Sequence, residues 1–223
     1  MKIAVCSIFD SSYTELGNIT IYDNCKQYCD KYGYDLIVRT DNFQLPRHQI
    51  GFEKIDLILS IMKSSQHDLI FWRGVDTMIT NFSKQLTDII ELDNFFIIAA
   101  DVHGINADSF IIKNCAKSIE FFEEILRDKN MYIDEQHAFK MLQSKYDIKV
   151  IPQKFINSYD YKLYCTQEEF NHNGYQSECE PGLDIFGQNG QWSDGDFMIH
   201  WPGITLSKRI ELANEYQNKV IYA

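Results

Sequence analysis

The sequence has no apolar run of the roughly 20 residues that a membrane-spanning helix needs. Its first residues hold one lysine and the short apolar run Ile3–Phe9, without a small-residue cleavage site. We therefore expect a first strand there, with no signal peptide and no membrane span. The cysteines show no CxxC spacing, and a reduced, intracellular protein is the simplest interpretation.

Clusters of basic residues are also missing. The chain has 21 Lys and Arg against 32 Asp and Glu, which gives a net charge of −11, and the basic residues are dispersed. Because neutralising a polyanion needs clustered Lys and Arg, we expect no nucleic-acid partner. An acidic excess favours solubility and, locally, the binding of a divalent cation.

Two nucleotide-binding signatures are absent. GxGxxG does not follow the first predicted strand, and GxxxxGK[ST] occurs nowhere in the chain. Both motifs use glycines that let the backbone approach phosphate groups. Their absence disfavours a Rossmann dehydrogenase and a P-loop enzyme.

What is present predicts one folded α/β domain over residues 1–223. The chain is 45% hydrophobic and 24% charged, which excludes general disorder. Strands and helices alternate, and this pattern is typical of a mostly parallel, helix-covered sheet. The predicted strands are Ile3–Phe9, Asp35–Val38, Asp68–Trp72, Phe95–Ala100, Ser109–Ile112, Ile148–Ile151 and Phe197–His200, and a second short apolar stretch, Thr77–Thr80, follows Asp76. The predicted helices are Asn18–Tyr32, Gly51–Lys63, a short one near Ser83–Glu91, Asn114–Arg127, Asp134–Tyr146 and Thr205–Asn218.

Two helix ends have clear signals, and one long segment has none. Asn18 is predicted to cap the first helix and Gly33 to end it, with Asp10–Gly17 as a loop before it. Residues 157–196 show no clear period, so we expect substrate-specific loops there. The aromatic residues in this region either stack on sugar rings or form a small core: Tyr159, Tyr161, Tyr164, Phe170, Tyr175, Phe186 and Trp192.

Asp76 and His200 are the candidate metal ligands. Asp76 follows the apolar run DLIFW, and His200 ends the run DFMIH, so each is predicted at the end of a strand, on one sheet. Ligands bind at the carboxyl ends of strands in open α/β sheets. Mn²⁺ accepts oxygen ligands together with one imidazole. An ordinary turn or core role remains the alternative for each residue.

Further polar residues are candidates for donor contacts. Lys54, and Lys208 or Arg209 in the first turn of the last helix, could neutralise phosphate oxygens, or lie on solvated helix faces. Asp10 and Tyr13, after the first strand, could hold a base or a ribose, or be ordinary loop residues.

Two polar clusters are candidates for sugar contacts. Acidic residues and Gln136 open the helix that begins at Asp134; they either cap it or face a reacting sugar. The loop DVHGINAD is either a cradle for sugar hydroxyls or a polar turn. Its polar members are Asp101, His103, Asn106 and Asp108.

In their order, these elements resemble the GT-A-fold glycosyltransferases that use nucleotide sugars, in particular the galactosyl-, mannosyl- and xylosyltransferase family. The resemblance covers roughly residues 2–208. The chain is also similar to glycosyltransferase domains encoded by large algal DNA viruses. Its motifs are GFEKIDLILSIM, DLIFWRGVDTMITN, INADSFIIKN, DEQHAF, INSYDY and FMIHWPG.

The resemblance implies roles for particular residues. Asp76 corresponds to the last Asp of the family's DxD motif, and His200 to a late metal-binding histidine whose His-x-x-Gly motif ends at Gly203. Lys208 corresponds to a contact with the donor diphosphate. Gln136 and Asp134 correspond to a pair beside the anomeric carbon of the donor sugar.

One position departs from the family pattern. Gly74 stands where the family has the first Asp of DxD. Three outcomes are open: Asp76 and His200 suffice with water and diphosphate oxygens, metal binding is weak, or the chain is inactive.

The function that the resemblance implies is transfer of a hexose or deoxyhexose from a UDP-sugar to a hydroxyl of a glycan or glycoprotein, with Mn²⁺ or Mg²⁺. Residues 1–100 would form the half that binds the nucleotide, and residues 101–223 the half that binds the acceptor. The expected location is the cytoplasm, or the host cytoplasm if the gene is viral. The family retains anomeric configuration; inversion would need a base such as Asp108, Asp134 or Asp184. A sugar nucleotidyltransferase and a non-catalytic sugar-binding module are the alternatives.

Overall fold

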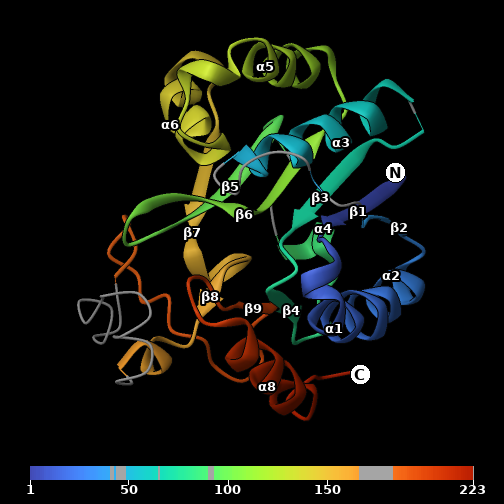
Figure 1. The fold of residues 1–223 in the computed structure, drawn as a ribbon, viewed down its shortest axis with the longest axis vertical. Coiled ribbons are helices and arrows are strands. Elements are labelled where there is room, and N and C mark those ends of the chain that lie inside the picture. The colour runs from blue at the N-terminus through green and yellow to red at the C-terminus, as the bar shows by residue number, and fades with distance from the viewer. Residues whose placement is uncertain (41–42, 44–48, 65, 90–92, 166–182, 223) are drawn as a thin grey trace.

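The computed structural model describes residues 1–40, 43, 49–64, 66–89, 93–165 and 183–222 (Figure 1). In this part of the chain a six-stranded sheet has the order β2-β1-β3-β6-β5-β7. Every strand of it runs parallel to β1 except β6. Its strands are β1 Ile3–Ile8, β2 Asp35–Arg39, β3 Leu69–Arg73, β5 Phe96–Asp101, β6 Gly104–Lys113 and β7 Lys149–Pro152. The predicted mostly parallel α/β sheet is confirmed.

A second, three-stranded sheet has the order β4-β9-β8 and is formed by β4 Thr77–Ile79, β9 Met198–His200 and β8 Ser158–Tyr159. In it β4 pairs antiparallel with β9, and β8 pairs parallel with β9. Segments that are about 120 residues apart in the chain therefore lie side by side, as Figure 1 shows below the central sheet.

Buried side chains on both faces explain the apolar runs of the central strands. On β3, Ile70 and Trp72 join one core cluster, whereas Leu69 and Phe71 join the cluster on the opposite face. Alternate residues of a strand point to opposite faces, so a strand covered on both sides is apolar throughout.

Three helices cover one face of the sheet: α3 Gly51–Lys63, α5 Ala116–Arg127 and α6 Glu135–Tyr146. All three were predicted, with α3 at its observed bounds. The other face packs on α2 Lys26–Tyr32 and the small sheet, and α8 Leu206–Gln217 covers a third cluster near the C-terminus. Shorter elements are α4 Leu86–Ile89 and the 3₁₀ turns Lys129–Met131, Gln153–Phe155 and Tyr161–Cys165.

The first helical segment starts earlier than predicted. Asp10 caps a 3₁₀ turn over Ser11–Tyr13, with its carboxylate accepting from the backbone N–H of Ser12, and the chain continues through α1 Thr14–Gly17 and a π-helical segment to α2. The predicted loop Asp10–Gly17 and the predicted Asn18 cap are therefore wrong. Asn18 has helical φ and ψ of −59° and −47°, because the helical segment already begins eight residues earlier at the Asp10 cap.

The strand predicted at Ser109–Ile112 is longer and antiparallel to its neighbours. Asp101 pairs with Gly104 in a tight hairpin, and Gly104 adopts φ of +101°, a conformation that side chains disfavour. The predicted loop DVHGINAD is therefore mostly hairpin, with Asn106 and Asp108 on β6.

The aromatic residues after residue 157 form a small core where the structure describes them. Tyr159, Tyr161, Tyr164 and Trp192 are buried, whereas Phe186 is exposed; Phe170 and Tyr175 lie outside the described residues. The cysteines with described side chains are free: Cys6, Cys25, Cys29 and Cys115. No helix within the described ranges is long and apolar enough to cross a membrane.

Gly33 ends α2 as predicted and offers a stability test. It adopts φ of +67°, and no atom lies within 4 Å of the place where a Cβ would stand. Gly33→Ala is therefore expected to cost about 1 kcal/mol through backbone strain alone. Gly33→Asn should cost less, because Asn tolerates this conformation better. Urea unfolding of both variants measures the difference; equal stability of the wild type and the Ala variant would contradict the strain argument.

Candidate active site

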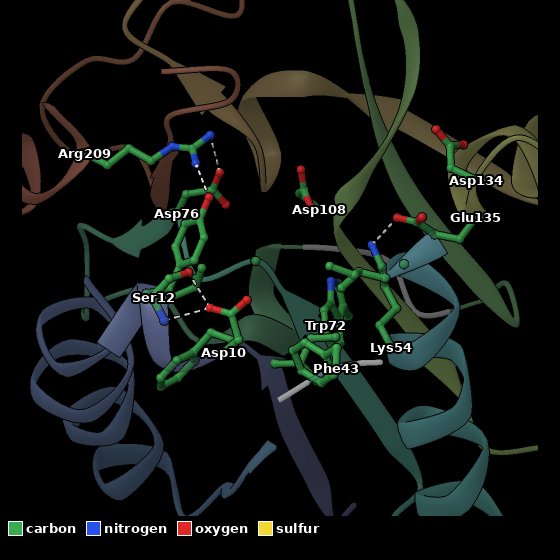
Figure 2. A pocket seen from close by; sticks show the side chains of 17 residues that line it. Asp10, Ser12, Phe43, Lys54, Trp72, Asp76, Asp108, Asp134, Glu135 and Arg209 are labelled. Carbon is green, nitrogen blue, oxygen red and sulfur yellow. Dashed lines mark hydrogen bonds and ion pairs between the residues drawn. The ribbon is translucent and has the colours of Figure 1, made fainter. Parts of the chain in front are cut away.

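A cavity of about 610 Å³ opens where β1 and β3 end (Figure 2). Its walls come from the residues after β1 and β3, from the starts of α3 and α6, and from β6 and α8. The charged side chains that line it are the acids Asp10, Asp76, Asp108, Asp134 and Glu135 and the cations Lys54 and Arg209. Five carboxylates against two cations make this a site that attracts positive charge.

The small sheet brings Asp76 to His200. Thr77 on β4 pairs with His200 on β9, and the backbone N–H of Trp201 donates to the Asp76 carbonyl over 3.0 Å. His200 Nε2 lies 3.6 Å from Asp76 Oδ2. The two residues predicted as a pair are therefore neighbours. The prediction that both end strands of one sheet is wrong: β3 belongs to the central sheet and β9 to the small one, because β4 turns away after Asp76.

A chain of hydrogen bonds fixes the His200 ring. Tyr159 donates its hydroxyl to Asp101 over 2.7 Å and accepts from the Asn157 side-chain amide over 3.1 Å. The Asn157 Oδ1 atom then faces His200 Nδ1 at 2.8 Å, so Nδ1 carries the proton. Burial, followed by Asp101, raises the pKa of Tyr159 well above its ordinary value and keeps the hydroxyl protonated.

His200 Nε2 is left with a lone pair at a fixed place. The side chain is fully buried, and Nε2 makes no hydrogen bond among the described residues. A metal-binding histidine generally donates its other ring N–H to an acceptor, as His200 does to Asn157. The orphaned nitrogen therefore fits a metal ligand.

Three ligand atoms meet at this point. One atom each from Asp76, Asp108 and His200 lies within 4.8 Å of the other two. Adjacent ligands of an octahedral cation about 2.1 Å away lie about 3 Å apart and opposite ones about 4.2 Å. Two carboxylates and an imidazole form a donor set that suits Mn²⁺, so the residues present fit a divalent cation.

The two carboxylates lie in different electrostatic surroundings. Although burial alone would raise it, the Arg209 guanidinium holds the pKa of Asp76 below its usual range. Burial, followed by the negative charge of Asp76, raises the pKa of Asp108. The mutual repulsion of the two carboxylates is what a bound cation would relieve.

Arg209, rather than Lys208, faces the cavity. Its guanidinium lies 3.0 Å from Asp76 Oδ2, as Figure 2 shows. It also donates to the Trp201 carbonyl over 2.9 Å. The Lys208 ammonium pairs instead with Glu211 over 2.7 Å on the outer side of α8. Of the two candidates for a diphosphate contact, Arg209 is the one that the helix directs inward.

Lys54 is tied to Glu135 across the cavity from Arg209. The ammonium lies 2.6 Å from Glu135 Oε1 and donates to the Ala107 carbonyl over 3.0 Å, and the lysine is 4% exposed. Gly51 makes room for this pair, because a Cβ there would lie 1.5 Å from Glu135 Oε2. Glu135 therefore neutralises much of the charge that Lys54 would offer to a phosphate.

The start of α6 places Asp134 of the predicted pair in the cavity wall, whereas Gln136 is not among the lining residues. Asp134 lines the cavity while its carboxylate caps α6 by accepting from the His137 N–H over 2.7 Å. Gln136 Oε1 accepts from the Ala107 N–H over 2.9 Å and so braces β6 next to Asp108. Asp134 therefore caps the helix, as one of the two alternatives stated, and it also forms part of the cavity wall.

The other predicted site residues are placed as follows. Asp10 and Tyr13 line the cavity, and the Tyr13 hydroxyl accepts from Arg209 over 3.4 Å. Gly203 turns the chain from β9 into α8 with φ of +68°. Asp184 lies elsewhere: its carboxylate accepts backbone N–H groups of its own turn and of Gln153.

The fold and this site define the class of protein: an α/β fold of the GT-A glycosyltransferase type. A glycosyltransferase involved in glycosylation of the major capsid of PBCV-1 shares it with a TM-score of 0.72 at 13% identity, over 96% of this chain and 100% of the other. The galactosyltransferase LgtC, solved with donor and acceptor sugar analogues, has a TM-score of 0.51 at 11% identity, over 97% and 100% of the two chains. At sequence identities this low, the similarity to these two structures shows a shared fold alone.

The chain belongs to the galactosyl transferase GMA12/MNN10 family, which it matches over residues 6–93 and 89–210. It is also similar to a probable alpha-1,2-galactosyltransferase, gmh1, of Schizosaccharomyces pombe, with 25% identity over 155 residues. The match covers 63% of this chain and 37% of that protein, so the chain spans well under two thirds of its relative.

Sequence reasoning missed two contacts of the site and left one choice, Lys208 or Arg209, undecided although it had a readable signal. On α8 the buried residues Arg209, Leu212, Ala213 and Tyr216 recur every three or four positions, which distinguishes Arg209 from Lys208. The pairing of Lys54 with Glu135 and the support of His200 by Asn157 link distant segments, and no local pattern announces them.

Proposed function

We propose that this chain transfers a hexose, with galactose the first to test, from a UDP-sugar to a hydroxyl of a glycan or glycoprotein, and that it requires Mn²⁺ or Mg²⁺. The observation that carries the proposal is the unpartnered, buried His200 Nε2 beside Asp76, which itself lines a cavity with four further carboxylates and two cations. Membership in a galactosyl transferase family supports the choice of sugar.

The charge of the cavity supports a metal requirement. A nucleoside diphosphate is an anion, and on its own it would meet more carboxylates than cations here. A divalent cation held by Asp76 and His200 would neutralise charge on the leaving diphosphate. Arg209, fixed by Trp201, adds a cation on the same side. The cavity volume is within the usual range for sites that take small molecules.

Other residues take roles that their positions allow. Asp10 and Tyr13 would hold the base or ribose, since both line the cavity near the end of β1. Gln136 and Asp134, at the start of α6, would position the donor sugar, the first by holding Ala107 and β6 in place. Retention follows the family; for inversion, Asp108 and Asp134 are the carboxylates at the cavity.

Neither alternative function gains support from the site. A nucleotidyltransferase would need cations in the loop after β1 for a triphosphate, and there the chain places the acidic Asp10. A sugar-binding module would not need an unpartnered imidazole nitrogen placed beside carboxylates. Donor turnover separates an enzyme from such a module.

The experiment is to measure UDP release from UDP-galactose, UDP-glucose and UDP-xylose with Mn²⁺, with Mg²⁺ and with EDTA. We expect UDP release from at least one donor with a metal and none with EDTA. In calorimetry, UDP should bind about tenfold or more tightly with Mn²⁺ than without it. Metal-independent UDP binding without any turnover would contradict the proposal and favour a binding module.

A further inference from the structure

Gly74 stands where the family has the first Asp of its DxD motif, so this position has no carboxylate. The neighbouring strand β6 carries a carboxylate, that of Asp108, opposite this position. The Gly74 N–H donates to the Asp108 carbonyl over 2.7 Å, which extends the β3–β6 ladder one pair beyond Arg73 and Ser109. Asp108 is therefore the cross-strand neighbour of Gly74. Side chains at directly opposed positions of an antiparallel pair lie close together.

The space beside Gly74 is bounded by two carboxylates. A Cβ built on Gly74 would lie 2.8 Å from Asp76 Oδ1, 3.4 Å from Asp108 Oδ1 and 3.5 Å from Asp108 Cβ. A carboxylate at position 74 and the carboxylate of Asp108 would thus compete for one volume. The glycine leaves that volume to Asp108.

An independent observation shows what the two carboxylates face. His200 Nε2, fully buried and without a hydrogen bond among the described residues, lies 3.5 Å from Asp108 Oδ2 and 3.6 Å from Asp76 Oδ2. In the neutral ring Nδ1 carries the proton that Asn157 accepts, and Nε2 then presents a lone pair to both carboxylates. Such a nitrogen is satisfied by a cation between these groups.

One hydrogen-bond network holds Asp108 and His200 in register. The Asn106 Oδ1 atom accepts from the Asp108 N–H over 3.0 Å, and the Asn106 amide donates to Asp101 and to the Tyr159 hydroxyl. Tyr159 in turn accepts from Asn157, which holds His200. The backbone at Asp108 and the ring of His200 are therefore held by the same buried polar groups, and such outer partners generally orient the ligands of a metal.

We propose that Asp108, from β6, is the second carboxylate ligand of the divalent cation and replaces the acidic residue that position 74 lacks. Residues 74 and 108 are then exchangeable sources of one carboxylate. This inference rests on the proposed metal-dependent function and assigns Asp108 a different role from that of a general base.

The test measures Mn²⁺ binding directly, from the loss of the electron paramagnetic resonance signal of free Mn²⁺, with and without UDP. The variants are Asp108→Asn, Asp108→Gly and the exchange variant Gly74→Asp/Asp108→Gly. Asp30→Asn is the matched control, because it removes one negative charge from an exposed pair with Lys26. Asp76→Asn reports on the metal site as a whole. Thermal unfolding shows that each variant is folded.

We expect Asp108→Asn and Asp108→Gly to weaken Mn²⁺ binding at least about tenfold, the scale seen when even indirect metal contacts are removed. The exchange variant should recover most of the affinity that Asp108→Gly loses, and Asp30→Asn should bind as the wild type does. Because Asp108→Asn preserves size, its result stands even if a glycine variant does not fold.

Two results would overturn the proposal, and they differ in reach. If Asp76→Asn loses Mn²⁺ binding while Asp108→Asn keeps it, the assignment of Asp108 is wrong and the proposed function stands. If the wild type itself binds no Mn²⁺ with or without UDP, the metal requirement of the proposed function fails as well.

Discussion

Asp76→Asn is expected to lower the metal-dependent release of UDP from UDP-galactose by about 100- to 1000-fold. Asp76 lies 3.6 Å from His200 Nε2 and 3.0 Å from the Arg209 guanidinium, so it connects the proposed metal site with Arg209. Removing its charge weakens the hold on the cation that offsets charge on the leaving diphosphate. Asn keeps the size of the side chain and can still accept a hydrogen bond from Arg209.

The matched control for Asp76 is Glu211→Gln on α8. Glu211 is exposed and pairs with Lys208 on the outer side of the helix, so its loss should leave UDP release within about twofold of the wild type. Thermal unfolding of Asp76→Asn separates lost activity from lost folding. Metal-dependent turnover near the wild-type rate in a folded Asp76→Asn variant would remove Asp76 from the metal site.

Lys54→Met is expected to lower the free energy of unfolding by about 3 kcal/mol, because it leaves the Glu135 carboxylate without its partner. The ammonium is buried, pairs with Glu135 over 2.6 Å and lies 5.3 Å from the centre of the Trp72 ring. Breaking a buried ion pair on one side costs more than removing both partners. The double variant Lys54→Met/Glu135→Gln should therefore lose less stability than the sum of the single variants.

The same helix supplies the control for Lys54. Lys63 on α3 pairs with Glu123 over 2.7 Å, and both side chains are about half exposed. Lys63→Met should cost under about 1 kcal/mol, as solvated ion pairs do. Urea unfolding of the variants provides the comparison. Two results would each show that the buried pair contributes little to stability. In one, Lys54→Met and Lys63→Met lower the free energy of unfolding equally; in the other, the effects of the Lys54 and Glu135 substitutions simply add in the double variant.

The prediction of the candidate site was most accurate where nearby residues in the sequence determine where a side chain lies. Asp76 and His200 were predicted from apolar runs that end in a polar residue, and the two do lie together. At the start of the last helix the residues left Lys208 and Arg209 as alternatives, and the resemblance selected Lys208, although the inward stripe contains Arg209. The amphipathic period of α8 was the better guide, since a helix turns adjacent residues about 100° apart.

Other features of the site depend on pairings between distant segments. That β9 would join β4 in a separate sheet, and that Asp108 would lie opposite Gly74, follows from strand register, which no local pattern near residue 76 specifies. The early start of the first helical segment at Asp10 was a local signal, a capping residue, that was assigned to a loop instead.

By itself the sequence determined the alternation of strands and helices, the mostly parallel α/β sheet and the ends of helices such as α3 and α2, because burial periodicity and capping act over a few residues. The tertiary structure decided which side chains meet. It alone placed the Asp108 carboxylate in the space that Gly74 leaves, and it directed the orphaned His200 nitrogen at that space. Contacts between residues far apart in the chain depend on how whole elements pack, and that packing is settled only by the complete fold.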